Sequence, residues 1–392
     1  MKILAVNAGS SSLKFQMFEM PSEKVLISGN FERIGIDGSF YTIKLNGEKI
    51  RHEVVLNTHD DAVKYLNKEL LDNKIIDSLD EIKGIGHRIV QGADYFDKTV
   101  VIDDEVLKII SDLSLLAPLH NPAAVIGIKA FQKAVPNAVH TAVFDTAFHQ
   151  TMDEVSYMYA LPYEWYQKYK VRKYGAHGTS HKYIAERMRE ILGSDSLKII
   201  SCHIGNGGSI TAIKDGKCVD TSMGFTPNAG IIMGSRCGDT DVSIIPYIME
   251  QANLSPREVD TIINKQSGLL GISGVSSDAR DIDEGIANGN ERCILARKMY
   301  VRRIIDYIAR YYVLLGGADA IVFTAGVGEN SKEVRAEVIE GLSALGIYLD
   351  KDANDCRGCE KLISSKESKV KCYIIPTNEE VMIARDTYNL SL

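Results

Sequence analysis

Two turn-forming stretches of small and polar residues contain residue types that could bind phosphate. The first, residues 7–12, interrupts two apolar runs that are predicted to form a β-hairpin. Gly9 permits backbone conformations that other residues resist, and the hydroxyl and N–H groups of such a turn form a concave anion site. Lys14 follows closely and adds a positive charge. The stretch predicts a phosphate-binding hairpin, with an ordinary serine-rich turn as the alternative.

Residues 198–210 repeat this layout about half a chain later: an apolar strand, a polar residue, a glycine-rich turn and a second apolar strand. When the two stretches are superposed, Asn7 falls on His203 and Gly9 on Gly205. The repeat predicts two similar halves, each offering a phosphate loop to one cleft. Two such loops suit a nucleoside triphosphate better than one.

A third glycine turn, residues 325–330, follows the apolar run 320–324. It lacks the full G-x-G-x-x-G spacing and the downstream acid of a dinucleotide site, which disfavours a nicotinamide dehydrogenase. The chain also has no G-x-x-x-x-G-K-[ST] motif and no protein-kinase signature set, so neither a P-loop protein nor a protein kinase is predicted.

Three cationic or hydrogen-bonding side chains lie in loop-like sequence. Arg88 and Arg236 are flanked by glycines, and His177 lies between small residues. Phosphoryl transfer needs such groups, because negative charge spreads over the equatorial oxygens of the moving group. A structural ion pair is the alternative for each arginine, and a buried structural histidine is the alternative for His177.

Two acids and one further histidine lie where elements are predicted to end or begin. Asp145 and Glu379 follow strands and precede helices, so they could hold Mg²⁺ directly or through water, or could be helix-capping acids. Asn121 and Pro122 are a good N-cap and first residue for a helix. His120 is therefore expected at the mouth of a helix N-terminus.

The elements that must position these residues follow from hydrophobic periodicity and turn signals. Strands are predicted at 1–6, 13–18, 25–34, 39–44, 82–85, 138–144, 198–210 (a hairpin), 320–324 and 370–375. Helices are predicted at 58–71, 103–116, 122–134, 182–192 (capped by Ser180), 291–315 and 379–392, with a long loop at 221–241. In this scheme residues 86–88 form a loop after the strand 82–85.

Composition restricts the class of protein. With 392 residues, 25% charged and 45% hydrophobic, the chain is expected to form two globular domains. The net charge of −7 and the lack of a basic run argue against nucleic acid, and no apolar stretch could span a membrane. Seven cysteines and no signal peptide predict a cytoplasmic protein with free thiols. Cys356 and Cys359 form one C-x-x-C, but no second pair stands at zinc-site spacing.

Nine motifs occur in the order in which the acetate kinase family has them: VNAGSSSLKF, GHRIVQG, LAPLHNP, VFDTAFH, YGAHGTSH, SCHIGNGGSI, MGSRCGD, TAGVGEN and PTNEE. Over essentially its whole length the chain resembles this family of the actin, Hsp70 and sugar kinase superfamily. The resemblance implies an α/β fold with two duplicated actin-like (ribonuclease H-like) domains and a nucleotide cleft between them. It assigns residues 1–150, completed by helix 379–392, to the acyl substrate and residues 151–378 to the nucleotide and to dimerisation.

The resemblance also implies roles for single residues. Asn7 and Glu379 match the family's Mg²⁺ positions, with Mn²⁺ as an alternative ion. Asp145 matches the residue usually assigned as catalytic acid or base, and His177 and Arg236 match the pair that stabilises the transition state. Positions matching the family's acyl-substrate contacts are Arg88, Val90, Leu119, His120 and Pro227. Positions matching its nucleotide contacts are Lys14, His203, Ile204, Gly205, Asn206, Gly207, Asp278, Ala279, Arg280, Gly326, Val327, Gly328, Glu329 and Asn330.

The implied reaction is direct transfer of the γ-phosphoryl group of ATP to acetate, giving acetyl phosphate and ADP. Acetate is already ionised at neutral pH, so its attacking oxygen has no proton to lose. We therefore expect Asp145 to orient Mg²⁺ or Arg88 rather than to act as a general base. Alanine stands at position 176, where the family often has phenylalanine, and this predicts a wider acyl pocket that also accepts propionate.

Two other functions stay open at this point. The first is a kinase for propionate or another short-chain acid, and the second is a non-kinase ATPase of the same superfamily fold. Arg88, His177 and Arg236 together disfavour the second. The family further implies a homodimer formed through the C-terminal domain, with helix 291–315 as the candidate contact.

Overall fold

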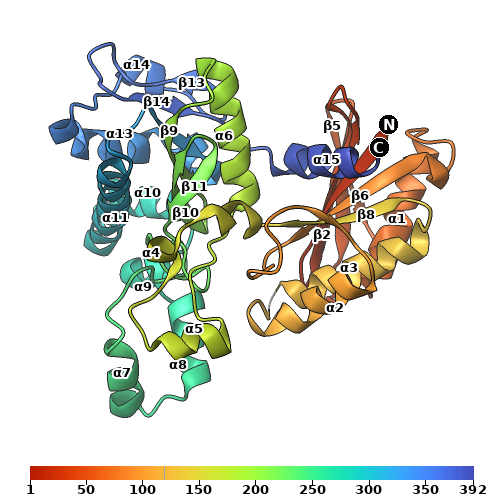
Figure 1. Cartoon of the computed structure of the whole chain (residues 1–392), viewed down its shortest axis with the longest axis horizontal. Helices are drawn as coiled ribbons and strands as arrows, with labels where there is room; N and C mark the ends of the chain where they lie inside the picture. The colour runs from red at the N-terminus through yellow and green to blue at the C-terminus, as the bar shows by residue number, and fades with distance from the viewer. Residues whose placement is uncertain (119) are drawn as a thin grey trace. The chain divides into compact units, whose positions relative to one another are not determined.

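The computed structural model describes residues 1–118 and 120–392. The chain divides into two units (Figure 1). The N-terminal unit consists of Met1–Phe148 together with Asn378–Leu392, and the C-terminal unit consists of His149–Thr377. These borders lie close to those expected from the sequence, and the last helix belongs to the N-terminal unit. Both ends of the chain therefore lie in one unit.

The N-terminal unit is built on one mixed sheet with helices on both faces. Its strands are β1 (Lys2–Ala8), β2 (Ser12–Glu19), β3 (Lys24–Glu32), β4 (Phe40–Leu45), β5 (Glu48–Glu53), β6 (Ile82–Ile89), β7 (Val100–Val101) and β8 (Val139–Phe144). Its helices are α1 (His59–Asp72), α2 (Asp104–Asp112), α3 (Asn121–Ala134) and α15 (Glu379–Leu390). The strand order is β5-β4-β3-β2-β1-β6-β8-β7.

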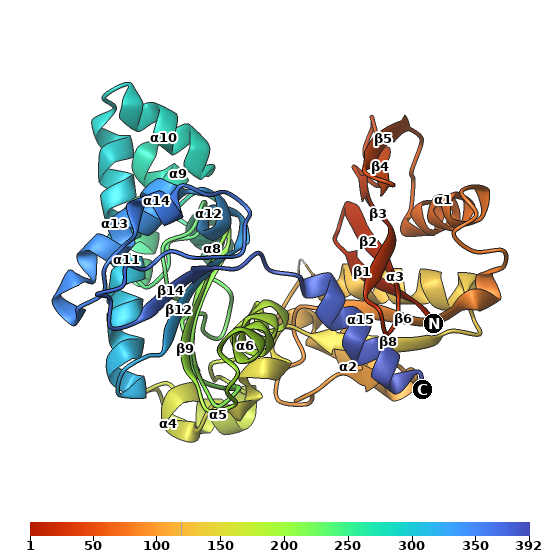
Figure 2. The ribbon, with the colours of Figure 1, turned by 90° about the horizontal axis from the view of Figure 1, so that it is seen from above.

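Helix α15 packs on β6 because that strand has glycines where the two meet. A Cβ at Gly84 would lie 2.8 Å from Thr387 Cγ2, and one at Gly86 would overlap the side chains of Ile383 and Thr387. Successive strand residues face opposite sides of a sheet. The ring of His87 accordingly lies edge-on to Phe131 of α3, which covers the other face (Figure 2). Arg88, two residues after Gly86, faces the same side as α15.

The C-terminal unit has a second mixed sheet. Its strands are β9 (Lys198–Ile204), β10 (Gly208–Lys214), β11 (Lys217–Thr221), β12 (Ala320–Thr324), β13 (Lys361–Leu362) and β14 (Lys371–Ile374). Its helices are α4 (Glu154–Tyr157), α5 (Tyr163–Tyr169), α6 (Gly178–Leu192), α7 (Ile244–Ala252), α8 (Pro256–Lys265), α9 (Gly268–Ser273), α10 (Ala279–Ala287), α11 (Glu291–Leu315), α12 (Ala325–Asn330), α13 (Lys332–Gly341) and α14 (Lys351–Asn354). Helices α11 and α6 cover opposite faces of this sheet (Figures 1 and 2).

The two sheets share a common centre. In the N-terminal unit the order β3-β2-β1-β6-β8 combines two antiparallel pairings with two parallel ones, and β11-β10-β9-β12-β14 repeats this pattern in the C-terminal unit. Each centre begins with a hairpin, β1–β2 or β9–β10, closed by a predicted glycine turn. The predicted fold class, two duplicated actin-like α/β units, is therefore confirmed.

Most predicted elements are present, but four local predictions were wrong. Strand β6 continues to Ile89, so Arg88 lies in a strand rather than a loop. Ser180 lies inside α6, which begins earlier with His177 at its N-cap. Residues 325–330 form the short helix α12 instead of a turn. Asn121 is the first residue of α3, and its buried side chain bonds to the backbone of Gln91 and Ile110.

Candidate functional site

Arg88 and Asp145 form a forked ion pair in the N-terminal unit. Strands β6 and β8 run parallel with Ile89 opposite Phe144, so their carboxyl ends meet at one sheet edge, where open α/β sheets bind ligands. The Asp145 N–H donates to the Ile89 carbonyl oxygen at 2.8 Å. Arg88 Nε donates to Asp145 Oδ1 at 3.0 Å and Nη2 donates to Oδ2 at 2.7 Å. Such two-pronged contacts fix the guanidinium plane.

Glu379, the first residue of α15, joins this pair. Its Oε2 lies 3.9 Å from Arg88 Nη1. Burial lowers the pKa of Arg88, but Asp145 and Glu379 raise it more, so the guanidinium stays charged. Burial also raises the pKa of Glu379, against the lowering effect of Arg88. Two carboxylates beside one arginine leave a local excess of negative charge when both are ionised.

The residues predicted to hold Mg²⁺ fit a hard cation. Glu379 Oε1 is buried and has no hydrogen-bond partner among the residues that the structure describes. Asn7, half-buried near the end of β1, supplies an amide and stands opposite Lys14 in the hairpin. In that described part, no group of three or more His, Cys, Asp or Glu forms a metal cluster. Mg²⁺ commonly binds through one or two carboxylates plus water and phosphate oxygens. The carboxylate of Glu379 and the amide oxygen of Asn7 are ligands of this kind.

Arg236 in the C-terminal unit is a half-buried cation of a different kind. Its Nη1 donates to the Pro227 carbonyl oxygen at 3.0 Å and lies 3.8 Å from Met233 Sδ. Within the described ranges it forms no ion pair with a carboxylate, and burial lowers its pKa. The guanidinium lies against the β9–β10 turn, since a Cβ at Gly207 would be 3.5 Å from its Nη1. This arrangement leaves the positive charge of Arg236 available for an anion.

His177 is held in an unusual conformation at the start of α6. Its φ of 60° lies in the left-handed region, which costs free energy for a non-glycine residue. Its ring stacks on His203 with 4.1 Å between ring centroids. His177 Nδ1 and the Ser209 hydroxyl are 2.9 Å apart. The ring stacking on His203 of β9 and the Nδ1 contact with Ser209 of β10 thus tie His177 to this hairpin.

The same hydroxyl continues a buried chain of hydrogen bonds. His181 Nε2 lies 2.8 Å from Ser209 Oγ, and His181 Nδ1 lies 2.8 Å from Ser201 Oγ. Burial, together with two neighbouring histidines, lowers the pKa of His181 well below its usual value. Ser180 bonds His203 Nδ1 at 2.8 Å and Thr377 Oγ1 at 2.7 Å. Roles for Ser201, Ser209 and His181 were not predicted from the sequence, although two of the motifs contain these residues.

A cavity of about 670 Å³ lies within the C-terminal unit. Eight of the predicted nucleotide residues line it: Gly205, Asn206, Asp278, Ala279, Arg280, Gly326, Val327 and Asn330. Its volume is in the range that holds a small molecule of cofactor size. Asp278 caps α10 and pairs with Arg280, which lowers its pKa to about 2. Gly234 is required at the wall, because a Cβ there would lie 2.6 Å from the Ser277 carbonyl oxygen.

Eight further residues that were not predicted from the sequence also line the cavity: Gly234, Leu269, Ser277, Asp283, Tyr300, Ser331, Glu333 and Arg357. These residues come from segments that carry no phosphate-binding pattern of their own. Of the other predicted nucleotide residues, Lys14 belongs to the N-terminal unit, and His203, Ile204, Gly207, Gly328 and Glu329 lie beside the cavity-lining turns. Glu329 Oε1 accepts the backbone N–H groups of Ala325 and Thr377, which stabilises α12.

The predicted acyl contacts are distributed over both units. Val90 directly follows β6 and is half-buried, and His120 is exposed at the N-terminus of α3. Leu119 lies outside the described residues. Pro227 accepts the hydrogen bond from Arg236, as described above. Ala176 is buried and packs in a small cluster with Met223 and Met233.

The duplicated fold, its glycine turns and its nucleotide-sized cavity define a kinase of the actin-like class. The sequence profile of the acetokinase family matches residues 2–385. The acetate kinase of Geobacillus sp. (strain WCH70) is 55% identical over 392 residues, covering 100% of this chain and 99% of that protein. The chain belongs to the acetokinase family, and it is a phosphotransferase with a carboxyl group as acceptor.

Solved structures agree with this assignment. The crystal structure of Porphyromonas gingivalis acetate kinase has a TM-score of 0.94 and 46% identity, with 99% of both chains covered. The propionate kinase from Francisella tularensis subsp. tularensis SCHU S4 also reaches a TM-score of 0.94, with 41% identity and 99% of both chains covered. The fold is thus common to kinases named for different short acids. No helix in the described residues is long and apolar enough to cross a membrane.

Proposed function

We propose that the protein catalyses reversible, Mg²⁺-dependent, in-line transfer of the γ-phosphoryl group between ATP and acetate. The observation that carries this proposal is Arg236, a half-buried guanidinium without a carboxylate partner in the described residues, set against the Gly205–Gly207 turn. A cation kept unpaired in a low-dielectric position stabilises developing negative charge strongly, because no reorganisation is needed during reaction. ATP and ADP are assigned to the adjoining cavity.

Arg88 binds the carboxylate of the acyl substrate in this proposal. Its Nε and Nη2 donate to Asp145, so Nη1, which Glu379 Oε2 approaches only to 3.9 Å, is the group left to donate to a substrate carboxylate. A short carboxylic acid with a pKa of about 4–5 is ionised at neutral pH and needs no general base. Asp145 therefore acts as a positioning residue that holds the guanidinium plane of Arg88.

Mg²⁺ is assigned to Glu379 and Asn7, with Mn²⁺ as an alternative ion. The unpartnered Glu379 Oε1 supports this assignment, since a buried carboxylate oxygen without a partner is costly unless a cation or water meets it. When bound, the ion neutralises phosphate charge and orients the transferring group. Lys14, exposed on β2 opposite Asn7, adds a mobile positive charge for phosphate.

His177 is assigned to donate a hydrogen bond from Nε2–H to the transferring phosphoryl group. A neutral imidazole that donates from Nε2 must accept at Nδ1. The Ser209 hydroxyl then donates to His177 Nδ1 and accepts from His181 Nε2–H. His181 Nδ1 in turn accepts from the Ser201 hydroxyl. In this orientation the buried chain holds His177 as the Nε2–H tautomer, and the lowered pKa of His181 keeps that chain neutral.

Acetate is the proposed acceptor, and propionate kinase activity is the alternative. Ala176 removes bulk, but its methyl group already packs against Met223 and Met233, which are adaptable side chains. One methylene changes the free energy of a transition state in an apolar pocket by about 1–3 kcal/mol. We expect measurable activity on propionate, with a ratio of kcat/KM for acetate over propionate not far above roughly 200.

Trapping of acyl phosphate with hydroxylamine tests the proposed function. The enzyme is incubated with ATP, Mg²⁺ and acetate, propionate or butyrate. Fast product from acetate supports the proposal, and faster product from propionate supports the alternative. Arg88→Ala should raise the KM for acetate far more than that for ATP, whereas Arg189→Ala, a surface arginine paired with Asp195, is the matched control. ATP hydrolysis without acyl phosphate from any acid would contradict both readings.

We further propose that the protein is a cytoplasmic homodimer, as the family resemblance implies. Helix α11 buries one side in the core of the C-terminal unit, so that side is not available to a dimer interface. Leu295, Met299 and Val313 of this helix are exposed. Helix α7 has no buried residue, and it exposes Ile244 and Tyr247. Light scattering coupled to gel filtration measures the state: a mass of one chain at micromolar concentration would contradict the dimer.

A further inference from the structure

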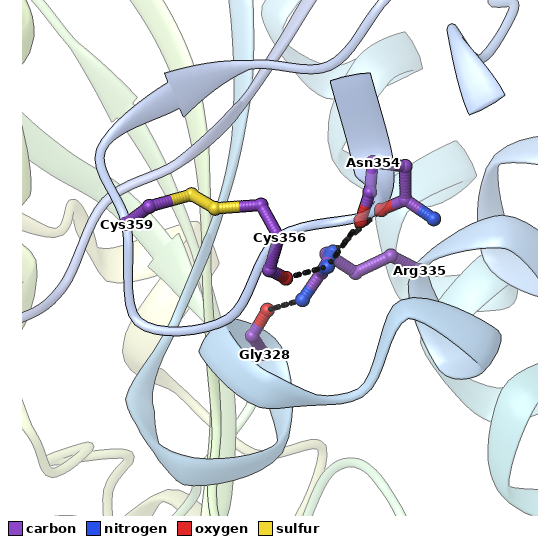
Figure 3. The surroundings of a disulfide bond; sticks show 5 residues. All are labelled: Gly328, Arg335, Asn354, Cys356 and Cys359. Carbon is purple, nitrogen blue, oxygen red and sulfur yellow. Dashed lines mark hydrogen bonds between the residues drawn. A yellow bond between two sulfur atoms is a disulfide. The ribbon is translucent and has the colours of Figure 1, made fainter. Parts of the chain in front are cut away.

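Cys356 and Cys359 form a disulfide in a loop that follows α14 (Figure 3). Their Cα atoms lie 6.3 Å apart, within the span that a disulfide bridges. The expectation of free thiols is thus wrong for this pair. The other five cysteines are free, and Cys237 alone among those five is not fully buried. Both disulfide cysteines are half-buried, unlike the fully buried Cys202, Cys218, Cys293 and Cys372.

The disulfide loop is tied to the glycine segment of the cavity by one buried arginine (Figure 3). Arg335 Nη2 donates to the carbonyl oxygens of Cys356 at 2.8 Å and Asn354 at 2.9 Å. Its Nη1 donates to the Gly328 carbonyl oxygen at 3.0 Å. Arg335 is fully buried, so one buried side chain bonds both the loop and α12.

A second connection joins the two segments through the backbone. The N–H of Gly358 donates to the Glu329 carbonyl oxygen at 3.2 Å. Gly358 has a φ of 59°, in the left-handed region that glycine adopts readily. The loop between the two cysteines is thus held at both of its halves, by Arg335 on one side and by α12 on the other.

Arg357, between the two cysteines, lines the cavity assigned to the nucleotide. Three acidic residues, Asp278, Asp283 and Glu333, line the same cavity. Arg280 is already paired with Asp278, so Arg357 is the cation there that a phosphate-bearing ligand could meet without breaking that pair. Arg357 thus belongs both to the loop that the disulfide closes and to the cavity wall.

We propose that Cys356 and Cys359 are a redox-active pair that sets the affinity of the cavity for an adenine nucleotide. This inference rests on the proposed placement of ATP and ADP in that cavity. In the oxidised protein the closed loop holds Arg357 at the cavity. In the reduced protein the loop gains conformational freedom, and nucleotide binding must order it again, which weakens affinity.

The redox step is a two-electron exchange. A low-molecular-weight dithiol reduces the bond by thiol–disulfide exchange: the S–S bond breaks, two protein thiols form, and the dithiol leaves as its cyclic disulfide. Hydrogen peroxide reverses the step: the two thiols lose two protons and two electrons, the S–S bond forms, and the peroxide becomes two molecules of water. A metal role is not proposed, since the described residues hold no third ligand near the pair.

Calorimetric titration of the full-length protein with ADP tests the inference in the two redox states. One sample is reduced with dithiothreitol and the other oxidised with hydrogen peroxide, and thiol alkylation with mass spectrometry measures the state of the pair. We expect a Kd for ADP about 2- to 10-fold lower in the oxidised protein. This range corresponds to the free energy of immobilising one long side chain, here Arg357, on binding. The wild-type comparison needs no substitution, so it stays decisive if a variant misfolds.

Three variants test whether a change in the Kd for ADP between the redox states comes from Cys356 and Cys359 or from another part of the protein. Cys356→Ser combined with Cys359→Ser should bind ADP as the reduced protein does, with no response to oxidant. Arg357→Ala should form the disulfide but lose the affinity difference. Cys237→Ser, which removes the remaining partly exposed thiol, should keep the full response.

Two results would overturn the inference, and they are distinguishable. ADP binding with equal Kd in both verified redox states would refute the redox role and leave the nucleotide site intact. No ADP binding in either state would refute the placement of the nucleotide, and the redox inference with it.

Discussion

Ser209→Ala tests whether the buried hydrogen-bond chain controls catalysis by His177. The side chain of Ser209 is fully buried, and its hydroxyl is shared between His177 Nδ1 at 2.9 Å and His181 Nε2 at 2.8 Å. Removing it leaves two buried ring nitrogens without this partner, which costs about 1–3 kcal/mol for each unsatisfied group. The same change removes the contact that makes His177 Nδ1 an acceptor.

The effect on catalysis follows from the tautomer. We expect kcat to fall roughly 10- to 100-fold, or about 1.4–2.7 kcal/mol, because His177 no longer donates reliably from Nε2. KM for acetate and for ATP should change little, since the lost contact acts in the transition state. Steady-state kinetics by hydroxylamine trapping, at a temperature well below the unfolding midpoint of the variant, measures both parameters.

Thr211→Val is the matched control for this prediction. Thr211 lies two residues further along β10, is fully buried, and bonds the Thr221 hydroxyl at 2.8 Å. It should lose stability without losing kcat. If Ser209→Ala kept kcat within twofold of the wild type, or if Thr211→Val lost as much activity, the tautomer argument would be refuted.

Three further predictions follow from the charged and titratable groups. Arg236→Ala should lower kcat roughly 10²–10³-fold, the usual cost of one transition-state contact, and a near-normal kcat in the same trapping assay would contradict its assignment. Asp145→Asn should raise the KM for acetate and lower kcat at saturating Mg²⁺ through Arg88, without moving the pH profile of kcat between pH 5 and 9. If the variant retained most of kcat, the ion pair between Asp145 and Arg88 would not be needed for catalysis. If kcat no longer fell at acidic pH, Asp145 would instead act as a general base. Burial lowers the pKa of both His87 and His181 well below the usual value, so the unfolded chain binds protons below about pH 6.5 that the folded chain does not. Stability is then fully retained above pH 6.5 and falls as the pH drops, by up to about 1.4 kcal/mol per pH unit for each histidine. Urea unfolding at pH 7.5, 6.5 and 5.5 measures the slope, and a flat profile would refute it.

Local sequence determined the elements and the duplication. Apolar alternation around a glycine turn predicted the β1–β2 and β9–β10 hairpins, because both signals act within a few residues. The range 291–315 was predicted correctly for α11, where an N-cap asparagine and a terminal glycine mark both ends. The ordered motifs determined the family, since each is a local string.

Tertiary structure decided how the functional side chains are used. The pattern of 82–88 could not show that β6 continues through Arg88, because its pairing partner β8 lies more than fifty residues away in the chain. The sequence could place Asp145 and Glu379 at strand ends, but only packing of α15 on the glycines of β6 brings Glu379 to Arg88. Likewise, the sequence predicted Ser180 as the N-cap of α6. In the structure the N-cap is His177, in the left-handed conformation and in contact with β9 and β10.

The pairing of the two arginines Arg88 and Arg236 shows most clearly what the sequence determines and what the tertiary structure decides. As residues in a sequence, Arg88 and Arg236 are alike: both are flanked by glycines and both are candidates for binding an anion. In the structure Arg88 is paired with a carboxylate fork, whereas Arg236 lies half-buried against backbone and thioether atoms. The sequence by itself determined that both cations are present. Only the tertiary structure decided which is paired, because desolvation and pairing depend on residues that are distant in the chain.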